Sequence, residues 1–188
     1  MTLETRRVFL LPLETTHFHS LASLANEQEM WRYFTVDLSD PAILQQWIQT
    51  ALDEKADKKR IPFVVVDKIE NKVAGSMSIG NISLHDLRGE IGWSWLGQQY
   101  RGTGVNLHAK FAMLQYLFDQ LEFERVEFKT DVLNERAKNG LIKLGAKQEG
   151  VLRSHMKMWN NRRRDSVYFS ILKSEWQQLK RTRFKDIQ

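Results

Sequence analysis

The chain contains no cysteine, only three prolines and no long apolar run among its 188 residues. The lack of cysteine excludes disulfides, a thiolate nucleophile and any zinc site built on cysteine ligands. No segment approaches the roughly 20 consecutive apolar residues that a membrane-spanning helix needs. The first residues, from Met1 to Arg7, do not precede the apolar core of a secretion signal. These absences predict a cytoplasmic protein without a membrane partner.

The remaining composition is that of one folded domain. Ten glycines and three prolines leave no room for a low-complexity linker, and 42% of the residues are hydrophobic. We therefore expect a single domain over residues 1–188, with a basic tail from about residue 177. The net charge of +5 favours acidic or phosphorylated partners. Two basic runs, 162–164 and 180–183, lack the interleaved aromatic residues of a single-strand nucleic-acid binder. We interpret them as solvated charge and expect no nucleic-acid partner.

The histidines do not form a pattern typical of a metal site. No two of them have the i, i+4 spacing of a helical ligand pair, and no carboxylate cluster accompanies them. The five are His17, His19, His85, His108 and His155. The sequence therefore predicts no metal. His108, in the first turn of a helix, could approach a phosphate, but we expect it to be an exposed surface residue.

Hydrophobic periodicity predicts a mixed α/β domain with one open, twisted sheet. The predicted order is one strand, two helices, three strands, a helix, a strand, a helix and two strands. Asp40 and Pro41 are typical of a helix N-terminus, as is Asn134, and Gly145 is typical of a helix end. Residues 63–66 are apolar on both strand faces, which predicts a central strand. The strand–helix–strand unit of residues 90–132 should be parallel and right-handed.

The segment 89–106 reads as a strand, a glycine-bearing turn and the start of a helix. Strict alternation would place Ile91, Trp93 and Trp95 on one strand face, and Glu90, Gly92 and Ser94 on the other. The free N–H groups and the dipole at a helix N-terminus attract anions, and glycine lets a phosphate approach the backbone. A Rossmann fingerprint would need a third glycine, and a Walker A loop would need Gly-Lys-Ser/Thr. From these residues alone, a phosphate site and a plain tight connection are both open.

The turn Arg101-Gly102-Thr103-Gly104-Val105-Asn106 resembles motif A of the GCN5-related N-acetyltransferases, Arg/Gln-x-x-Gly-x-Gly/Ala. It departs at Asn106, where that family has a small residue. Other segments resemble the RimJ/RimL-like branch, which acetylates the N-termini of ribosomal proteins. In chain order they are residues 3–10, 90–93 and 134–146, and Trp176 fits the branch as well. The resemblance thus covers most of the chain.

This resemblance implies a single domain with a mixed, mostly antiparallel sheet of about seven strands, split between the fourth and fifth strands. Acetyl-CoA would lie in the split, and backbone groups near Trp95 and Leu96 would pair with its pantetheine arm. Asn134 would contact the cofactor or an ordered water. The pyrophosphate would be held by six consecutive residues: Arg101, Gly102, Thr103, Gly104, Val105 and Asn106.

The reaction implied is transfer of an acetyl group to a primary amine. A protonated amine has no lone pair, and an α-amino group with a pKa near ~8 loses its proton more readily than a lysine near ~10.4. Glu90 is the candidate base, directly or through water. The alternative is a solvent-facing carboxylate, or one paired with Arg88. Many relatives carry a tyrosine acid where Leu141 stands, so water, Ser94 or no acid would serve the leaving thiolate.

The acceptor pocket is predicted from three residues: Trp31, Phe34 and His155. Core packing is the alternative for the two aromatic side chains. An aromatic pocket would suit a flat amine or a peptide N-terminus, so the acceptor could be a protein or a small amine-bearing metabolite or antibiotic. Two other hypotheses are open: a non-catalytic acyl-CoA-binding module and an RNA- or ribosome-associated protein. Relatives occur as monomers and homodimers.

Overall fold

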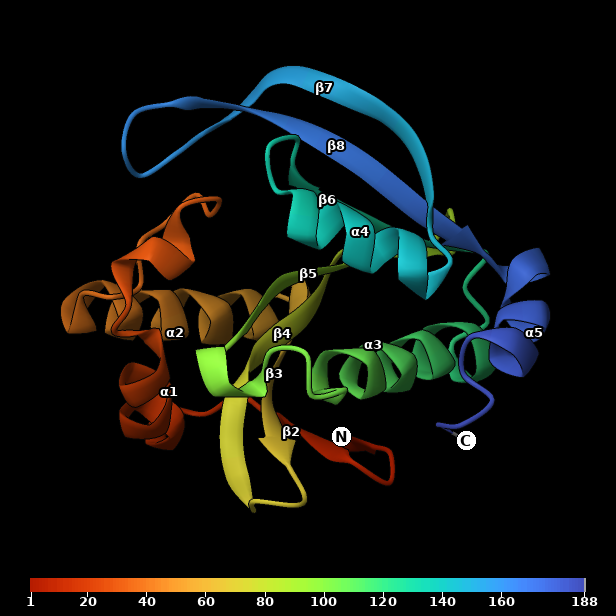
Figure 1. Cartoon of the computed structure of the whole chain (residues 1–188), viewed down its shortest axis with the longest axis horizontal. Coiled ribbons are helices and arrows are strands. Elements are labelled where there is room, and N and C mark those ends of the chain that lie inside the picture. The colour runs from red at the N-terminus through yellow and green to blue at the C-terminus, as the bar shows by residue number, and fades with distance from the viewer. Residues whose placement is uncertain (188) are drawn as a thin grey trace.

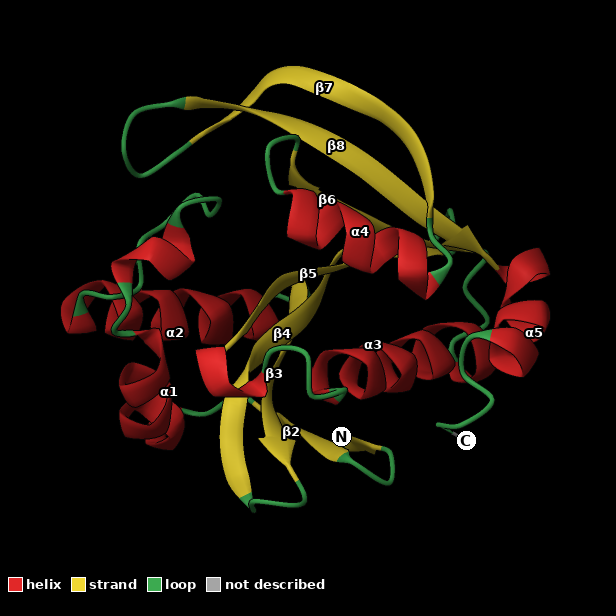
Figure 2. Cartoon of the chain, viewed as in Figure 1, coloured by secondary structure: helices red, strands yellow, loops and turns green. Residues whose placement is uncertain are grey.

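The computed structural model describes residues 1–187 and contains one open sheet of eight strands in the order β1-β2-β3-β4-β5-β6-β8-β7 (Figures 1 and 2). Five α-helices of the described residues flank this sheet. The strands are β1 (Leu3–Glu4), β2 (Val8–Pro12), β3 (Arg60–Asp67), β4 (Lys72–Ser83), β5 (Arg88–Leu96), β6 (Arg125–Asp131), β7 (Lys147–Lys157) and β8 (Arg163–Leu172). The helices are α1 (Phe18–Ala25), α2 (Pro41–Ala56), α3 (Val105–Gln115), α4 (Glu135–Leu144) and α5 (Lys173–Thr182).

The predicted order of elements and the predicted sheet are confirmed. Strands β2 to β5 pair antiparallel in chain order, and β6 pairs parallel to β5 after the α3 crossover. Strand β8 then pairs antiparallel with both β6 and β7. The sheet has one strand more than about seven, because the two-residue β1 pairs with β2. Strand β3 is central and almost wholly buried, as its apolar residues predict.

Capping residues set the ends of the helices as the sequence indicates. The Asp40 carboxylate accepts hydrogen bonds from the backbone of Ala42 at 2.7 Å and Ile43 at 3.3 Å, which starts α2. The Asn134 side chain accepts from the Ala137 amide at 3.1 Å and starts α4. Gly145 ends that helix with a left-handed φ of 101°.

Two apolar clusters cover the sheet from different helices. One contains the buried residues of α3, α4 and α5, and the other contains those of α1 and α2. Figure 1 shows these two helical groups on either side of the strands. The predicted basic tail is helical as far as Thr182, and Phe184 and Ile187 beyond it are buried in the first cluster. Among residues 1–187, the helices are too short or too polar to cross a membrane.

His108 contradicts the expectation of an exposed histidine. It is 9% exposed, and its Nδ1 lies 2.9 Å from Thr5 Oγ1. The N-terminal segment passes over the start of α3 and covers this side chain. The contact joins residues far apart in the sequence, so the local pattern gives no sign of it.

A β-bulge at Trp93 breaks the predicted alternation of β5. Ser78 pairs with Gly92, whereas Ser76 pairs with Trp95, so β5 holds one extra residue there. Trp93 adopts a left-handed φ of 50°. As a result, Ile91 packs in the α3 cluster while Trp95 packs in the α2 cluster. The prediction that these residues share one face was wrong because the extra residue reverses the side-chain direction beyond it.

Strands β5 and β6 pair only at their first residues and then separate. The paired positions are Arg88 with Arg125, Gly89 with Val126, and Glu90 with Glu127. Beyond Glu90, β5 continues to Leu96 bonded to β4 alone, and β6 continues to Asp131 bonded to β8 alone. The sheet is therefore split between β5 and β6, which are the fourth and fifth strands when the two-residue β1 is not counted, as the resemblance predicts. We call the last pair before the split, Glu90 and Glu127, the fork.

Candidate functional site

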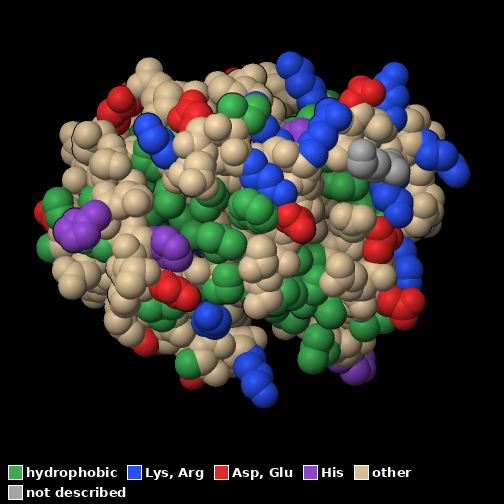
Figure 3. Space-filling view, turned by 90° about the horizontal axis from the view of Figure 1, so that it is seen from below, with side chains coloured by type: hydrophobic (Ala, Val, Ile, Leu, Met, Phe, Trp, Pro, Cys, Tyr) green, Lys and Arg blue, Asp and Glu red, His purple; other side chains and the backbone are tan. Residues whose placement is uncertain are grey.

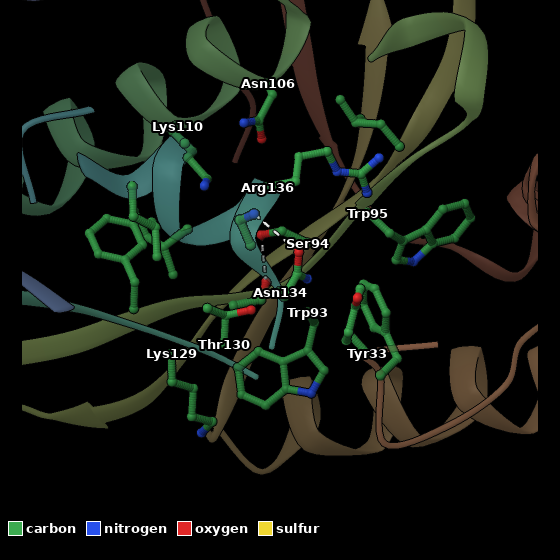
Figure 4. Close-up of a pocket in the computed structure, with 18 of the residues that line it drawn as sticks. Tyr33, Trp93, Ser94, Trp95, Asn106, Lys110, Lys129, Thr130, Asn134 and Arg136 are labelled. Carbon is green, nitrogen blue, oxygen red and sulfur yellow. Dashed lines mark hydrogen bonds between the residues drawn. The ribbon is translucent and has the colours of Figure 1, made fainter. Parts of the chain in front are cut away.

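A cavity of about 420 Å³ lies at the split, with walls from β5, β6, α3, α4 and the segment before α2 (Figure 4). Most of the residues predicted for the site line this cavity. They are Phe34, Glu90, Ser94, Trp95, Leu96, Arg101, Gly102, Asn106 and Asn134. The split thus brings together side chains from positions that are up to 100 residues apart in the sequence.

The turn before α3 has the geometry of an anion site. Gly102 and Gly104 have left-handed φ angles of 77° and 92°, and α3 starts at the next residue, so its first N–H groups have no helical partners. The left-handed φ favours glycine at 102, whereas crowding does not, because a Cβ there would meet nothing within 4 Å. Arg101 and Arg136 both line the cavity near this helix end, and burial and the nearby Arg136 lower the pKa of Arg101. Two cations and a helix dipole together favour a doubly charged anion.

Three residues of the predicted turn do not put side chains into the cavity. The Thr103 hydroxyl donates to the Tyr100 carbonyl oxygen at 2.8 Å, and Val105 is fully buried in the core. Gly104 forms the N-cap of α3. These positions could reach an anion only through their backbone N–H groups.

The cavity side of β5 offers free backbone groups. Ser76 and Gly75 of β4 pair with Trp95 and Leu96, and β6 has already separated at this level. The edge that faces the split therefore keeps unpaired N–H and C=O groups, which is how a strand binds an extended ligand. Asn134 faces this edge from the end of β6, and its amide nitrogen is left over after its oxygen caps α4.

Glu90 lies at the fork and is only 3% exposed. Its Oε2 accepts hydrogen bonds from Asn81 at 2.7 Å and Lys129 at 2.8 Å. Its Oε1 has no hydrogen bond within residues 1–187 and faces Gly92, where an added Cβ would lie 2.7 Å away. The alternative of a solvent-facing carboxylate, or one paired with Arg88, is wrong. One oxygen is fixed by partners and the other is open toward the cavity.

Ser94 and Leu141 lie farther along the same cavity. The Ser94 hydroxyl donates to the Gly92 carbonyl oxygen at 3.2 Å, so its proton already has a partner. Leu141 is 3% exposed and gives the α4 wall an apolar surface at the position where relatives carry a tyrosine. Neither side chain is placed as a free proton donor.

The three predicted acceptor residues occupy different environments. Phe34 lines the cavity, but Trp31 is fully buried and does not. The Trp31 indole N–H donates to the Ala25 carbonyl at 2.9 Å, and its ring packs edge-on against Phe34 and Trp95. His155 lies on β7 outside the cavity wall, and burial together with Lys129 and Arg164 lowers its pKa. Trp31 therefore packs behind the aromatic wall of the cavity.

The sequence reasoning missed several polar residues of the cavity. Lys110 and Arg136 were not singled out, although Lys110 stands four residues after Asn106 and so shares its helix face. Arg164 was interpreted as solvated charge, which is wrong, since it is 7% exposed and its Nε donates to Ser166 at 3.0 Å. Alternation along β8 could have shown that one arginine of the basic run points inward. Within residues 1–187, no three His, Asp or Glu side chains are grouped to hold a metal ion.

A family model described as an acetyltransferase (GNAT) domain matches residues 7–147. The chain belongs to this family. It is a GNAT-type N-acetyltransferase, and the resemblance to the GCN5-related family is confirmed, whereas membership of the RimJ/RimL-like branch stays a prediction. The fold of this family uses acetyl-CoA as its acetyl donor.

Two curated relatives carry N-acetyltransferase names. YdaF of Bacillus subtilis (strain 168), named as a proposed ribosomal N-acetyltransferase, is 30% identical over 108 residues. That match spans 57% of this chain and 58% of YdaF. The uncharacterized N-acetyltransferase p20 of Bacillus licheniformis is 27% identical over 176 residues, 93% of this chain and 98% of p20.

Solved structures share the whole fold. A GCN5-related N-acetyltransferase from Brucella melitensis superposes with a TM-score of 0.91 at 27% identity, covering 98% of this chain and 84% of the other. RimJ of Mycobacterium smegmatis, solved with CoA-disulfide, superposes with a TM-score of 0.80 at 18% identity, covering 93% of this chain and 88% of RimJ. At that identity the RimJ match concerns the fold alone. The fold of this GNAT protein is thus shared with a structure that holds a CoA derivative.

Proposed function

We propose that this GNAT protein transfers an acetyl group from acetyl-CoA to a primary amino group, preferably an α-amino group, in the cytoplasm. The observation that carries the proposal is the fork of the split sheet. There a buried carboxylate, Glu90, keeps one oxygen open toward a cavity that continues to an anion-binding turn. The phosphate groups of an acyl donor would bind at the turn, and an amine acceptor would bind beside Glu90.

The residues of the cavity fit acetyl-CoA. Arg101, Arg136 and the N-terminus of α3 would hold its pyrophosphate, because they supply two charges and free N–H groups. The free edge of β5 near Trp95 and Leu96 would hydrogen-bond the pantetheine amides. When bound, acetyl-CoA supplies an activated acetyl thioester.

The chain's own residues would then prepare the amine. Glu90 Oε1 would take the proton from the incoming ammonium, and the missing side chain of Gly92 leaves room for this oxygen. Backbone N–H groups on the free edge of β5 would stabilise the negative charge that develops on the carbonyl oxygen. Lys129 and Asn81 would keep Glu90 in place through its other oxygen.

Two acceptor classes are compatible with the cavity wall formed by Tyr33, Phe34 and Trp93. The name of YdaF supports the N-terminus of a ribosomal protein as the acceptor. The aromatic wall supports a small flat amine equally well. An RNA- or ribosome-associated function without catalysis has less support, since Lys and Arg are interspersed with Asp and Glu on the face shown in Figure 3. Whether the protein is a monomer or a homodimer stays a prediction.

A thiol-release assay tests the proposal. Because the chain has no cysteine, a thiol reagent reports only CoA that the reaction liberates. Acetyl-CoA with a panel of N-terminal peptides and small amines should give thiol release that depends on the amine, with acetylated product seen by mass spectrometry. Tight acetyl-CoA binding without release for any acceptor would contradict catalysis. Salt-sensitive RNA binding at physiological ionic strength, with no transfer, would favour the ribosome-associated alternative.

A further inference from the structure

Lys110 is a cation in the cavity that no described residue neutralises. It lies on α3, one turn after Asn106, and Figure 4 shows its side chain among the cavity residues. Within residues 1–187 it makes no hydrogen bond or ion pair, and its Nζ lies 5.6 Å from the centroid of the Phe128 ring. An ammonium held among protein atoms without a counter-charge costs stability. Such a group is typical of a functional site.

The strand register places Lys110 at the level of the fork. Glu90 and Glu127 form the last pair between β5 and β6, and Phe128 is the next residue of β6. The ammonium lies over the Phe128 ring, so it reaches the first residues of the split. A group bound in the cavity near the fork would therefore have Lys110 on its α3 side.

Lys110 and Glu90 approach the fork from opposite faces of the sheet. Phe128 and Ile91 belong to the apolar cluster that contains α3, the helix of Lys110. Glu90 and its partner Lys129 stand one residue away from these two positions, so their side chains point to the other face. A carboxylate is thus on one side of the fork and an ammonium on the other, so a base and an acid could act on a group held between them.

Partial burial in the cavity makes Lys110 a suitable proton donor. Desolvation lowers its pKa to about 8, close to the ~8.5 of an ordinary thiol. Proton transfer between groups of matched pKa is nearly balanced in free energy. The other charged residues of the cavity are Glu90, Arg101, Lys129, Arg136 and Arg164. Lys129 is already paired with Glu90, and the arginines do not release protons at neutral pH.

We propose that Lys110 is the catalytic acid, which holds the negative charge developing on the CoA sulfur and then gives it a proton. This inference rests on the proposed function. As the bond from the amine nitrogen to the acetyl carbon forms, the bond from that carbon to sulfur breaks and its electron pair goes to sulfur. The first proton of the ammonium passes through Glu90 to water before the attack, the nitrogen loses its second proton to Glu90 as the amide forms, and Lys110 gives one proton to the sulfur. Glu90 then returns its proton to water, and Lys110 takes one back. Lys110 thus does what the apolar Leu141 cannot do.

The test measures the pKa of the CoA thiol when it is bound to the protein. Thiolate absorbance in the ultraviolet, taken as the difference between the complex and the free protein, comes from CoA alone because the chain has no cysteine. In the wild-type complex the thiol pKa should be at least about one unit lower than in Lys110→Gln, since a cation beside a thiolate favours the charged form. Lys143→Gln removes the same charge from an exposed position of α4 outside the cavity and should match the wild type.

A second variant separates charge from proton transfer. Lys110→Arg keeps the cation but cannot donate its proton, so it should retain much of the lowered thiol pKa while kcat stays as low as in Lys110→Gln. Wild-type transfer should also decline above about pH 8, where Lys110 loses its proton, and Lys110→Gln should lack that decline.

The contrary outcomes are distinct from each other. Equal thiol pKa values in the wild type and Lys110→Gln, with CoA bound in both, overturn the role of Lys110 and leave the proposed function intact. Acetylation of Lys110 itself by acetyl-CoA, seen by peptide mass spectrometry, makes it an acceptor and also overturns the role. A wild-type protein that binds no CoA overturns the proposed function, and this inference with it.

Discussion

Glu90→Gln is the substitution that most directly tests the chemistry of the fork. Glutamine has nearly the shape of glutamate, so the close approach between this side chain and Gly92 is kept. The oxygen facing the cavity loses its ability to take a proton, and general-base catalysis contributes roughly 100- to 10,000-fold. We expect kcat/KM for amine-dependent thiol release to fall by at least about 100-fold. The loss should be greatest at low pH, where the neutral amine is scarce.

The same substitution also breaks a buried ion pair, and this effect must be separated from the catalytic one. The side chains of Glu90 and Lys129 are 3% and 16% exposed, and removing one partner of such a pair costs up to about 3–5 kcal/mol. The glutamine oxygen can still accept from Lys129, so we expect about 3 kcal/mol at most. A domain of this size is stable by roughly 5–15 kcal/mol, so the variant should remain folded. Urea unfolding measures the free energy of unfolding of the wild type and the loss in Glu90→Gln.

Two matched variants complete the experiment. Lys129→Gln breaks the same ion pair but keeps the carboxylate, so it should lose comparable stability and far less activity. Glu127→Gln changes the neighbouring carboxylate at the fork, which pairs with Arg125 and does not line the cavity. Equal losses of activity in Glu90→Gln and Lys129→Gln, or unchanged kinetics in Glu90→Gln, would refute the assignment of the base.

Three further outcomes follow from the structure. Arg101→Gln should weaken acetyl-CoA binding by about tenfold or more in calorimetry, because a charge-assisted hydrogen bond contributes ~1.5–3 kcal/mol, and an unchanged Kd would contradict the anion site. Gly145→Ala should lower the free energy of unfolding by about 1–3 kcal/mol, since φ is 101° and the new Cβ would lie 2.4 Å from Leu179. The hydrogen bond from Arg125 holds the pKa of Glu149 below its usual 4.5. Glu149→Gln should therefore lose up to about 1 kcal/mol at neutral pH, a small value for an exposed pair. That difference from the wild type should disappear as the pH falls below 4.5 through the lowered pKa, and a difference that persists in acid would contradict the cause.

Local signals predicted much of the fold correctly. Asp40, Asn134 and Gly145 act through hydrogen bonds and dihedral angles within a few residues. Their effect can therefore be predicted from the neighbouring sequence alone. The split of the sheet is different, because no periodicity reveals where two parallel strands separate. It was predicted only because motif A and its neighbours resemble a known family.

Two of the errors share a cause, which is contact between distant segments. His108 is buried by Thr5, and Arg164 is buried against the segment before α2, where its Nη1 lies 3.5 Å from the Tyr33 carbonyl oxygen. The bulge at Trp93 inserts one residue into an otherwise regular alternation, and a period-two pattern cannot show an insertion. Lys110 was missed for another reason. A lysine on an amphipathic helix is normally interpreted as surface charge, and only the fold shows that this one faces a cavity.

The narrow junction between β5 and β6 has a consequence for how the domain responds to its ligand. Only three backbone pairs join the sheet of β1 to β5 with the sheet of β6 to β8, so these two parts are held together mainly by helices and by whatever fills the split. A ligand that hydrogen-bonds both sides acts as a cross-brace. Occupancy at one hundred times Kd would add about 2.7 kcal/mol to the free energy of unfolding. Amide hydrogen exchange along 91–96 and 128–131 should slow when the donor binds. The ligand-free protein would thus open locally more often than the protein with bound donor.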